Sequence, residues 1–275
     1  DEAMVVSWGD SVRVVRSFTD DLVALDETLD AVSRRVARLD SDASEVAELA
    51  SRDFWFESVA ADPRVGTSIG STELSREVAA LQAYNTMKAK VAALRGLVAL
   101  MAGMEGRKSL VLVAHHFGRH PGREYYVGPR SGLVGLPQER DGQPLLEELA
   151  AAANASGVTF YGIYPYDNVT LISAADSASL NPSISSGAYG SGTDAIWMNE
   201  MAGLDFVTEK TGGTTAPHPG QLPGFLDQVA GDLGSYYSIG FPASVATRPG
   251  AVKVRVKRDG LTARTRATVA ERTAE

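Results

Sequence analysis

The chain contains no cysteine, and this absence excludes several kinds of chemistry at once. Without thiols there is no disulfide framework, no cysteine nucleophile and no cysteine-ligated metal. Positive charge is also scarce, because 26 Lys and Arg face 34 Asp and Glu and leave a net charge of −8. General affinity for nucleic acid depends on clustered basic residues. We therefore expect no nucleic-acid partner.

Long hydrophobic runs are missing as well. No uninterrupted apolar stretch approaches the roughly 18 residues of a membrane-spanning helix, and the sequence shows no signal peptide. We therefore expect no direct membrane span. The chain has 275 residues, of which 44% are hydrophobic, so it is long enough for one large globular domain or two small ones.

The first residues predict a β-hairpin followed by a helix. Residues 3–8 and 12–18 are rich in β-branched residues and flank a turn at Gly9-Asp10. The next segment has apolar residues at helical spacing, with Thr19 and Asp20 as its expected caps. Because the chain opens inside a hairpin, we expect the first central strand of the sheet to lie outside the given sequence.

Helical and strand patterns then alternate along the chain. The strand patterns at 108–114 (KSLVLVA) and 158–164 (VTFYGIY) are continuous apolar runs, which predicts strands buried on both faces. Helical patterns precede both runs, at 71–102 and 144–155, and this order predicts a mostly parallel sheet. The apolar face of the long first helix is expected to consist of Leu74, Val78, Leu81, Met87, Val91, Leu94, Val98 and Met101.

The remaining segments complete this outline. Residues 195–210 and 222–233 are expected to be helical, and 236–241 to form a strand. Polar or Ser- and Gly-rich insertions are expected near 40–70 and 168–193. At the end of the chain, two alternating segments flank Asp259-Gly260 and predict an antiparallel hairpin. We assign residues 1–241 to the main domain and 242–275 to a β-hairpin appendage packed on it.

Six stretches together carry a resemblance to a known family. In chain order they are MVVSWGDSVRVVRSFT, GRKSLVLVAHHFG, ANASGVTFYGIYPY, TEKTGGTT, SYYSIGF and GAVKVRVKRDGLTARTRATV. In order and spacing the chain resembles the von Willebrand factor type A fold, and within it the bacterial VWFA-related family described from acidobacteria. This resemblance implies a Rossmann-like, doubly wound sheet flanked by helices. It also implies a ligand face at the carboxyl ends of the strands.

Such domains often hold a divalent cation at that face. This sequence departs from the family's pattern of cation ligands. The expected D-x-S-x-S motif follows no apolar strand, and residues 42–45 (DASE) match it only in part. His115 and His116 stand where an Asp ligand is expected. We therefore expect a degenerate or absent metal-ion-dependent adhesion site and no cofactor. Mg²⁺ or Ca²⁺ would require a D-x-S-x-S segment upstream of the given sequence.

Candidate site residues follow from position in this fold. His115, His116, Tyr166 and Asp167 come after the two apolar strands and are the candidates for the binding face. Imidazole is a common ligand of transition metals, so His115, His116 and His120 are also candidate metal ligands. Gly118 and Pro121 break any helix that would align His116 with His120. A polar loop after a strand is the simpler interpretation of these histidines.

These observations favour a non-catalytic module for protein–protein interaction or adhesion. The resemblance implies an extracellular or periplasmic location and a protein partner. Two alternatives remain open. One is a structural subunit of an extracellular assembly or homo-oligomer, completed by a donated strand. The other is a metal-dependent enzyme that uses the histidine cluster.

Overall fold

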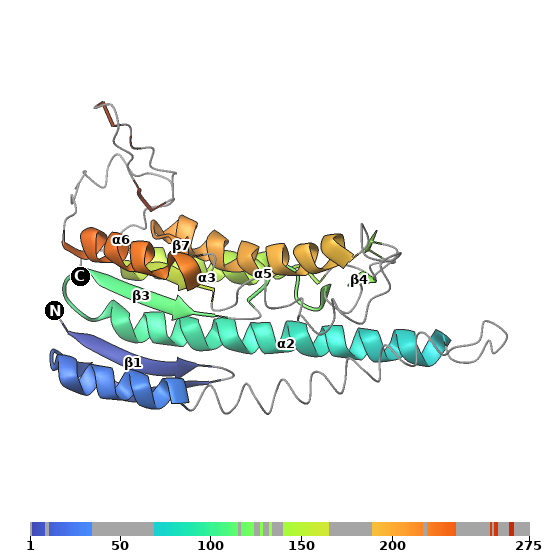
Figure 1. Cartoon of the computed structure of the whole chain (residues 1–275), viewed down its shortest axis with the longest axis horizontal. Helices are drawn as coiled ribbons and strands as arrows, with labels where there is room; N and C mark the ends of the chain where they lie inside the picture. Colours follow the sequence, from blue (N-terminus) through green and yellow to red (C-terminus); the bar gives the residue numbers. More distant parts are fainter. Residues whose placement is uncertain are drawn as a thin grey trace. The chain divides into compact units, whose positions relative to one another are not determined.

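The structure is a computed structural model of the whole chain, shown in Figure 1. It describes residues 2–8, 11–34, 69–114, 117–123, 127–128, 132–133, 140–164, 189–216, 219–234, 254, 256–257 and 264–266. These residues belong to two compact units, Asp1–Val78 and Ala79–Glu275. Each unit is described by itself.

The first unit contains the expected hairpin and helix. Strands β1 (Ala3–Trp8) and β2 (Val12–Thr19) pair antiparallel, which confirms the prediction from their alternating sequence. Residues 22–34 form a helix, but its cap differs from the expected one. Asp21 Oδ1 accepts hydrogen bonds from the backbone N–H groups of Val23 and Ala24. Thr19 instead accepts from the N–H of Asp21, so Asp21 rather than Thr19 or Asp20 caps the helix.

Helix α2 (Ile69–Ala102) runs from the first unit into the second. Most of its expected apolar face is buried from Met87 onward, because Met87, Val91, Leu94, Val98 and Met101 recur every three or four residues. The prediction is wrong at the start of this face. Val78 and Leu81 are 57% and 45% exposed, while Ala80 is buried in their place.

A three-stranded parallel sheet lies in the second unit. The strands β3 (Lys108–Val113), β6 (Val158–Ile163) and β7 (Thr215–Ala216) are hydrogen-bonded in the order β3-β6-β7. Lys108 pairs with Val158 and Val113 with Ile163, so β3 and β6 are in register along their whole length. This confirms the expected mixed α/β class with parallel strands joined by helices. A short antiparallel pair, β4 (Val127–Gly128) and β5 (Gly132–Leu133), lies between β3 and β6 in the sequence.

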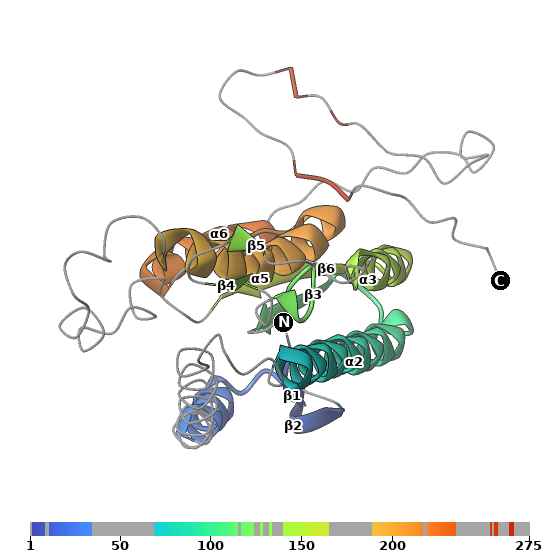
Figure 2. The same ribbon diagram turned by 90° about the vertical axis from the view of Figure 1, so that its right-hand side faces the viewer.

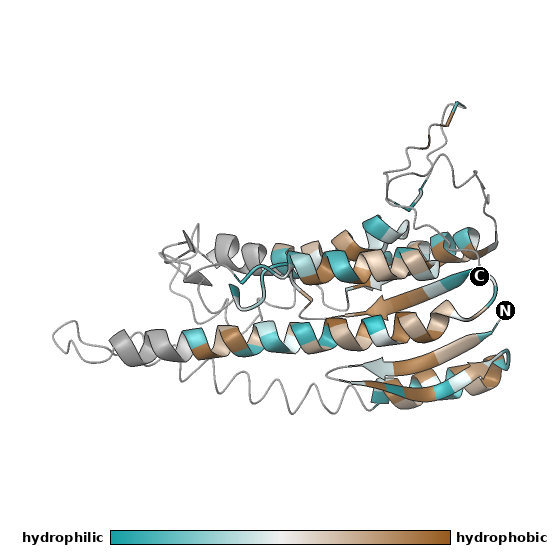
Figure 3. Cartoon of the chain, turned by 180° about the vertical axis from the view of Figure 1, so that it is seen from behind, coloured by the Kyte–Doolittle hydropathy of each residue, from teal (hydrophilic) through white to brown (hydrophobic). Residues whose placement is uncertain are grey.

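Strand β3 is at the edge of this sheet and is buried on one face alone. Leu112 is almost fully buried, but Val111 and Val113 on the other face are 46% and 55% exposed. The prediction of burial on both faces is therefore wrong for β3, although β6 fulfils it. Figure 3 shows the hydrophobic colour along most of this strand. A continuous apolar run predicts a strand, but it does not reveal which strand lies at the edge of the sheet.

Helices cover both faces of β6. Tyr161 packs with Phe225 and Val229 of α6 (Leu222–Gly234) on one face. On the other face, a Cβ at Gly162 would lie 2.7 Å from Leu204 of α5 (Tyr189–Thr211). Helix α3 (Gln143–Ser156) contacts both α5 and β6, and Figure 2 shows it beside β6. The core of the second unit is therefore centred on β6, with the 3-10 turn η2 (Pro219–Gln221) leading into α6.

Some expected boundaries differ, and others fall outside the described residues. Helix α5 begins at Tyr189, so residues 189–193 are helical rather than part of the expected insertion. The segments 35–68, 165–188 and 235–253 lie outside the described residues, together with the expected strand at 236–241. Most of the expected carboxyl-terminal hairpin also lies outside them.

Candidate functional site

The loop that follows β3, residues 117–123, is packed closely against helix α5. Phe117 and Gly118 are buried, and Gly203 of α5 faces them directly. A Cβ at position 203 would lie 1.9 Å from the carbonyl oxygen of Phe117. A Cβ at Gly118 would in turn lie 2.7 Å from the side chain of Asn199. Glycine at both positions therefore lets the loop approach the helix backbone.

Asn199 of α5 fastens this loop through three hydrogen bonds. Its side-chain Oδ1 accepts from the N–H of His120 at 2.8 Å, and its Nδ2 donates to the carbonyl of His120 at 3.0 Å. The N–H of Arg119 donates to the backbone carbonyl of Asn199 at 3.1 Å. Asn199 is itself buried. A loop held by paired bonds to a helix keeps a fixed position at the end of its strand.

Two further contacts hold the other side of the loop. The N–H of Gly142 donates to the carbonyl of Arg119 at 2.9 Å, which ties the loop to the start of α3. Gly122 has a φ of 86° and lies against Ala80 of α2, where a Cβ would be 2.6 Å from the Ala80 Cα. The loop is thus fixed at three places, on α2, α3 and α5.

The side chains on this fixed loop are mainly basic. Arg119 and His120 are partly exposed, and the guanidinium of Arg119 donates to Gln143 Oε1. His120 Nδ1 lies 4.0 Å from Asp141 Oδ1, which is too long for a hydrogen bond. Asp141 Oδ1 instead accepts from the N–H of Gln143 at the start of α3. This basic loop follows β3 at the carboxyl edge of the sheet.

A buried acid lies beside the neighbouring strand. The hydroxyl of Tyr164, directly after β6, donates to Glu200 Oε2 at 2.6 Å, and both residues are buried. Glu200 follows Asn199 in α5, so consecutive residues of this helix contact the chain after β3 and the chain after β6. The carboxyl ends of the two strands are therefore bound to one helix.

Of the candidate site residues predicted from the sequence, the structure describes His120 alone. His115, His116, Tyr166 and Asp167 lie outside the described residues, so their roles stay predictions. His120 lies on the fixed loop. The described residues contain no cluster of three or more His, Asp or Glu side chains that could hold a metal ion. Asn199, by contrast, was missed from the sequence, because it lies 79 residues from its partner within an ordinary helical pattern.

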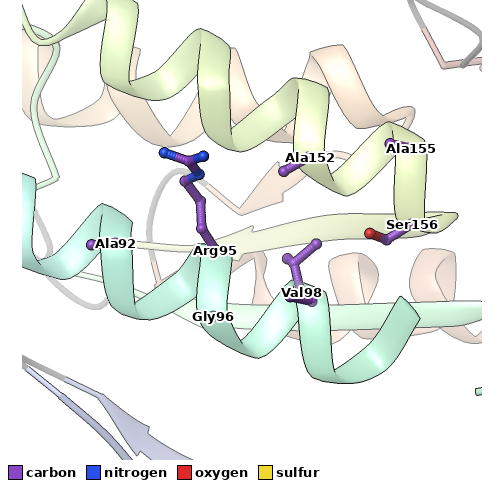
Figure 4. A pocket seen from close by; sticks show the side chains of 8 residues that line it. Ala92, Arg95, Gly96, Val98, Ala152, Ala155 and Ser156 are labelled. Atoms are coloured by element: carbon purple, nitrogen blue, oxygen red, sulfur yellow. The ribbon is translucent and has the colours of Figure 1, made fainter. Parts of the chain in front are cut away.

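Away from this loop, a concave feature lies between α2 and α3 and is shown in Figure 4. It is an open groove of about 500 Å³ whose walls are mainly small residues. Arg95 of α2 lines it and donates to Glu148 of α3 at 2.7 Å. The lining residues are Ala92, Arg95, Gly96, Val98, Ala99, Ala152, Ala155 and Ser156. Apart from Arg95 and Ser156 this lining has no polar side chain with which to recognise a ligand.

The opposite, amino edge of the sheet is occupied by a network around Tyr161. The Tyr161 hydroxyl donates to Asp232 Oδ2 at 3.3 Å and accepts from Arg107 at 3.4 Å. Burial raises the pKa of this hydroxyl above its ordinary value, and the nearby Asp232 carboxylate raises it further. The guanidinium of Arg264 contacts Asp232 as well. The network therefore ties the end of α6 to the start of β3.

Residues near the carboxyl terminus also reach this edge. Arg266 donates to the carbonyl of Gly157 at 2.7 Å, just after α3 ends. Burial lowers the pKa of the Arg266 guanidinium, and the charge of Arg107 lowers it further. Arg264 and Arg266 thus lie near the carboxyl termini of α6 and α3, where basic groups are favourable.

Comparison with known proteins does not assign this chain to a family. No protein-family model, no curated protein and no solved structure matches it. Within the described residues, no helix has both the length and the hydrophobicity that crossing a bilayer requires. The function must therefore be argued from the carboxyl edge itself.

Proposed function

We propose that this chain is a non-catalytic protein-interaction module of the von Willebrand factor A type, with a doubly wound, Rossmann-like sheet. Its metal-ion-dependent adhesion site is degenerate or absent, and its partner binds at the carboxyl edge of β3 and β6. An extracellular or periplasmic location is part of the same proposal. The resemblance of the six sequence stretches, together with the parallel sheet, supports this fold.

The observation that carries the binding role is the fixed loop 117–123. Asn199 and the start of α3 hold its backbone through four hydrogen bonds, so its charged side chains project from a rigid base. A rigid loop binds with a smaller loss of conformational entropy than a mobile one. Ligands of open parallel sheets bind outside the carboxyl ends of the strands, which is where this loop lies.

Site-specific photo-crosslinking in the native host tests this proposal. A photo-reactive amino acid replaces His120 on the loop, and in a matched control it replaces Ala151, an exposed residue of α3. We expect one discrete protein adduct from position 120 and none from position 151. No adduct at position 120, or equal adducts at both positions, would contradict a binding face at the carboxyl edge.

The edge position of β3 favours a second candidate, a subunit completed by a donated strand. The N–H of Ala114 bonds to Ile163 of β6, and alternate residues of a strand direct their N–H groups to opposite sides. The N–H groups of Val111 and Val113 therefore point away from β6. No strand among the described residues pairs with this edge, and both side chains are exposed. An open apolar edge is a template for strand addition.

The oligomeric state tests this second candidate. A subunit completed by another copy should form assemblies in light scattering, and Val111→Lys should dissociate them by placing charge at the edge. The matched variant Val78→Lys changes an exposed valine of α2 instead and should leave the assemblies intact. A wild-type chain that stays monomeric at micromolar concentration would exclude completion by a second copy.

A further inference from the structure

Three nitrogen atoms on the loop 117–123 are buried without a hydrogen-bond partner among the described residues. They are Arg119 Nε, His120 Nδ1 and Arg123 Nε, and all three belong to basic side chains within five consecutive residues. The two arginine Nε atoms are N–H donors, and a buried donor without a partner is unfavourable. Two such donors in one short loop mark a place where an acceptor group would be favourable.

The start of helix α3 lies against the same loop. Its N-cap residue, Gly142, donates its N–H to the carbonyl of Arg119. The N–H of Gln143, the first helical residue, is already bound to the Asp141 carboxylate. The helix start therefore positions the loop, and the positive charge at this place comes from the basic side chains of the loop.

Where the structure describes them, the acidic side chains near this loop already accept hydrogen bonds from other groups. Asp141 accepts from the N–H of Gln143, and Glu147 accepts from the Gln143 side chain at 2.7 Å. Glu200 accepts from Tyr164 in the buried pair. None of these three carboxylates is hydrogen-bonded to the three loop nitrogens, whose residues are all partly exposed. Because these three residues are only partly buried, part of each side chain remains accessible at the surface.

We infer that the loop 117–123, held in place by α5 and the start of α3, forms a docking site for a carboxylate side chain of the protein partner. The guanidinium groups of Arg119 and Arg123 match the planar, two-oxygen geometry of a carboxylate. The ligand is therefore an acidic, Asp- or Glu-containing segment. This inference rests on the proposed protein-binding function and names the chemistry of the partner.

The binding of a defined acidic peptide tests the inference. A fluorescein-labelled hexaglutamate peptide is titrated with the whole chain at low ionic strength, and hexaglutamine is the uncharged comparison. We expect the chain to bind hexaglutamate in preference to hexaglutamine. Adding salt should weaken the binding, because exposed charges are screened.

Matched charge removals locate the binding. The double variant Arg119→Gln, Arg123→Gln should reduce hexaglutamate affinity by roughly tenfold or more, because it removes two charge-assisted donors. Arg95→Gln removes one charge from the α2–α3 groove and should change affinity by no more than about twofold. The single variants Arg119→Gln and Arg119→Lys are then compared, and Arg119→Lys should lose less affinity because it keeps the charge. Circular dichroism and thermal melts confirm that each variant is folded before titration.

Three results would overturn the inference. They are no preference of the wild-type chain for hexaglutamate, an equal loss in Arg95→Gln and the double variant, and full affinity in a folded double variant. Failure here is distinguishable from failure of the proposed function. A discrete adduct at position 120 without hexaglutamate binding would refute the acidic ligand alone. Hexaglutamate binding without any adduct would refute the protein partner, and would leave only the affinity of the loop for carboxylates.

Discussion

At the scale of single residues, Asn199 and Tyr161 show how one side chain holds distant segments together. The side chain of Asn199 forms hydrogen bonds with the backbone N–H and carbonyl of His120. The hydroxyl of Tyr161, in β6, donates a hydrogen bond to Asp232 of α6. Neither role is visible in the sequence, since an Asn in a helical pattern and a Tyr in an apolar strand each have many ordinary explanations. Long-range polar pairing is decided by the fold rather than by local pattern.

The first prediction concerns Asn199. Asn199→Ala leaves the backbone N–H and carbonyl of His120 without these partners, so we expect the free energy of unfolding to fall by about 2–4 kcal/mol. Urea denaturation measures the change. Asn85→Ala, at an exposed position of α2, is the matched control and should shift stability by less than about 0.5 kcal/mol. Equal effects of the two substitutions would show that Asn199 does not fasten the loop.

The second prediction concerns the pH dependence of Tyr161. Its folded-state pKa is raised above 10.0, so folding favours the protonated phenol. The stabilisation is complete below the unfolded-state value and is lost as pH rises through the folded-state pKa. In an alkaline titration followed at 295 nm, we expect Tyr161 to ionise above its unfolded-state range. Tyr161→Phe should therefore reduce the late absorbance change by one tyrosine, and an unchanged late step would contradict the assignment.

At the scale of elements, the sequence predicts well what depends on local pattern. Alternation identified β1 and β2, and helical spacing identified α2, α3 and α6. Prediction of burial from the sequence fails where the position of a strand in the sheet decides which side chains are buried. The sequence of β3 is as apolar as that of β6, yet β3 is an edge strand and Val111 and Val113 are exposed. The ends of helices, such as the start of α5, are likewise set by their surroundings.

The third prediction compares two helical glycines. Gly203→Ala places a methyl group 1.9 Å from the Phe117 carbonyl oxygen, so α5 and the loop must separate. We expect a loss of stability of about 3 kcal/mol or more, in the range of severe overpacking. Gly96→Ala meets no atom within 4 Å and should stabilise α2 by about 0.5–1 kcal/mol.

Thermal and urea unfolding measure the stability of these two variants relative to the unmodified chain. The predicted changes in stability have opposite signs. Because both variants exchange glycine for alanine in a helix, the difference between them does not come from helix propensity. If Gly203→Ala were as stable as Gly96→Ala, the close approach of α5 to the loop would be wrong. The fixed base of the proposed binding face would then be wrong with it.

At the scale of the whole molecule, the two edges of the sheet have different characters. The amino edge is closed by contacts between Arg107, Arg264, Arg266 and nearby acidic or carbonyl groups. The carboxyl edge presents a rigid loop with basic side chains and unpaired donors. This asymmetry supports our proposal that a partner binds at the carboxyl edge, where open parallel sheets bind their ligands.

Hydrogen–deuterium exchange of the chain, alone and with the partner captured at position 120, tests this central claim most directly. We predict slower amide exchange on binding in residues 117–123 and in the first turn of α3, and unchanged exchange in α6. Protection along β3 alone would favour strand donation over the proposed binding face. Protection confined to α6, or to the α2–α3 groove, would contradict a partner at the carboxyl edge of the sheet.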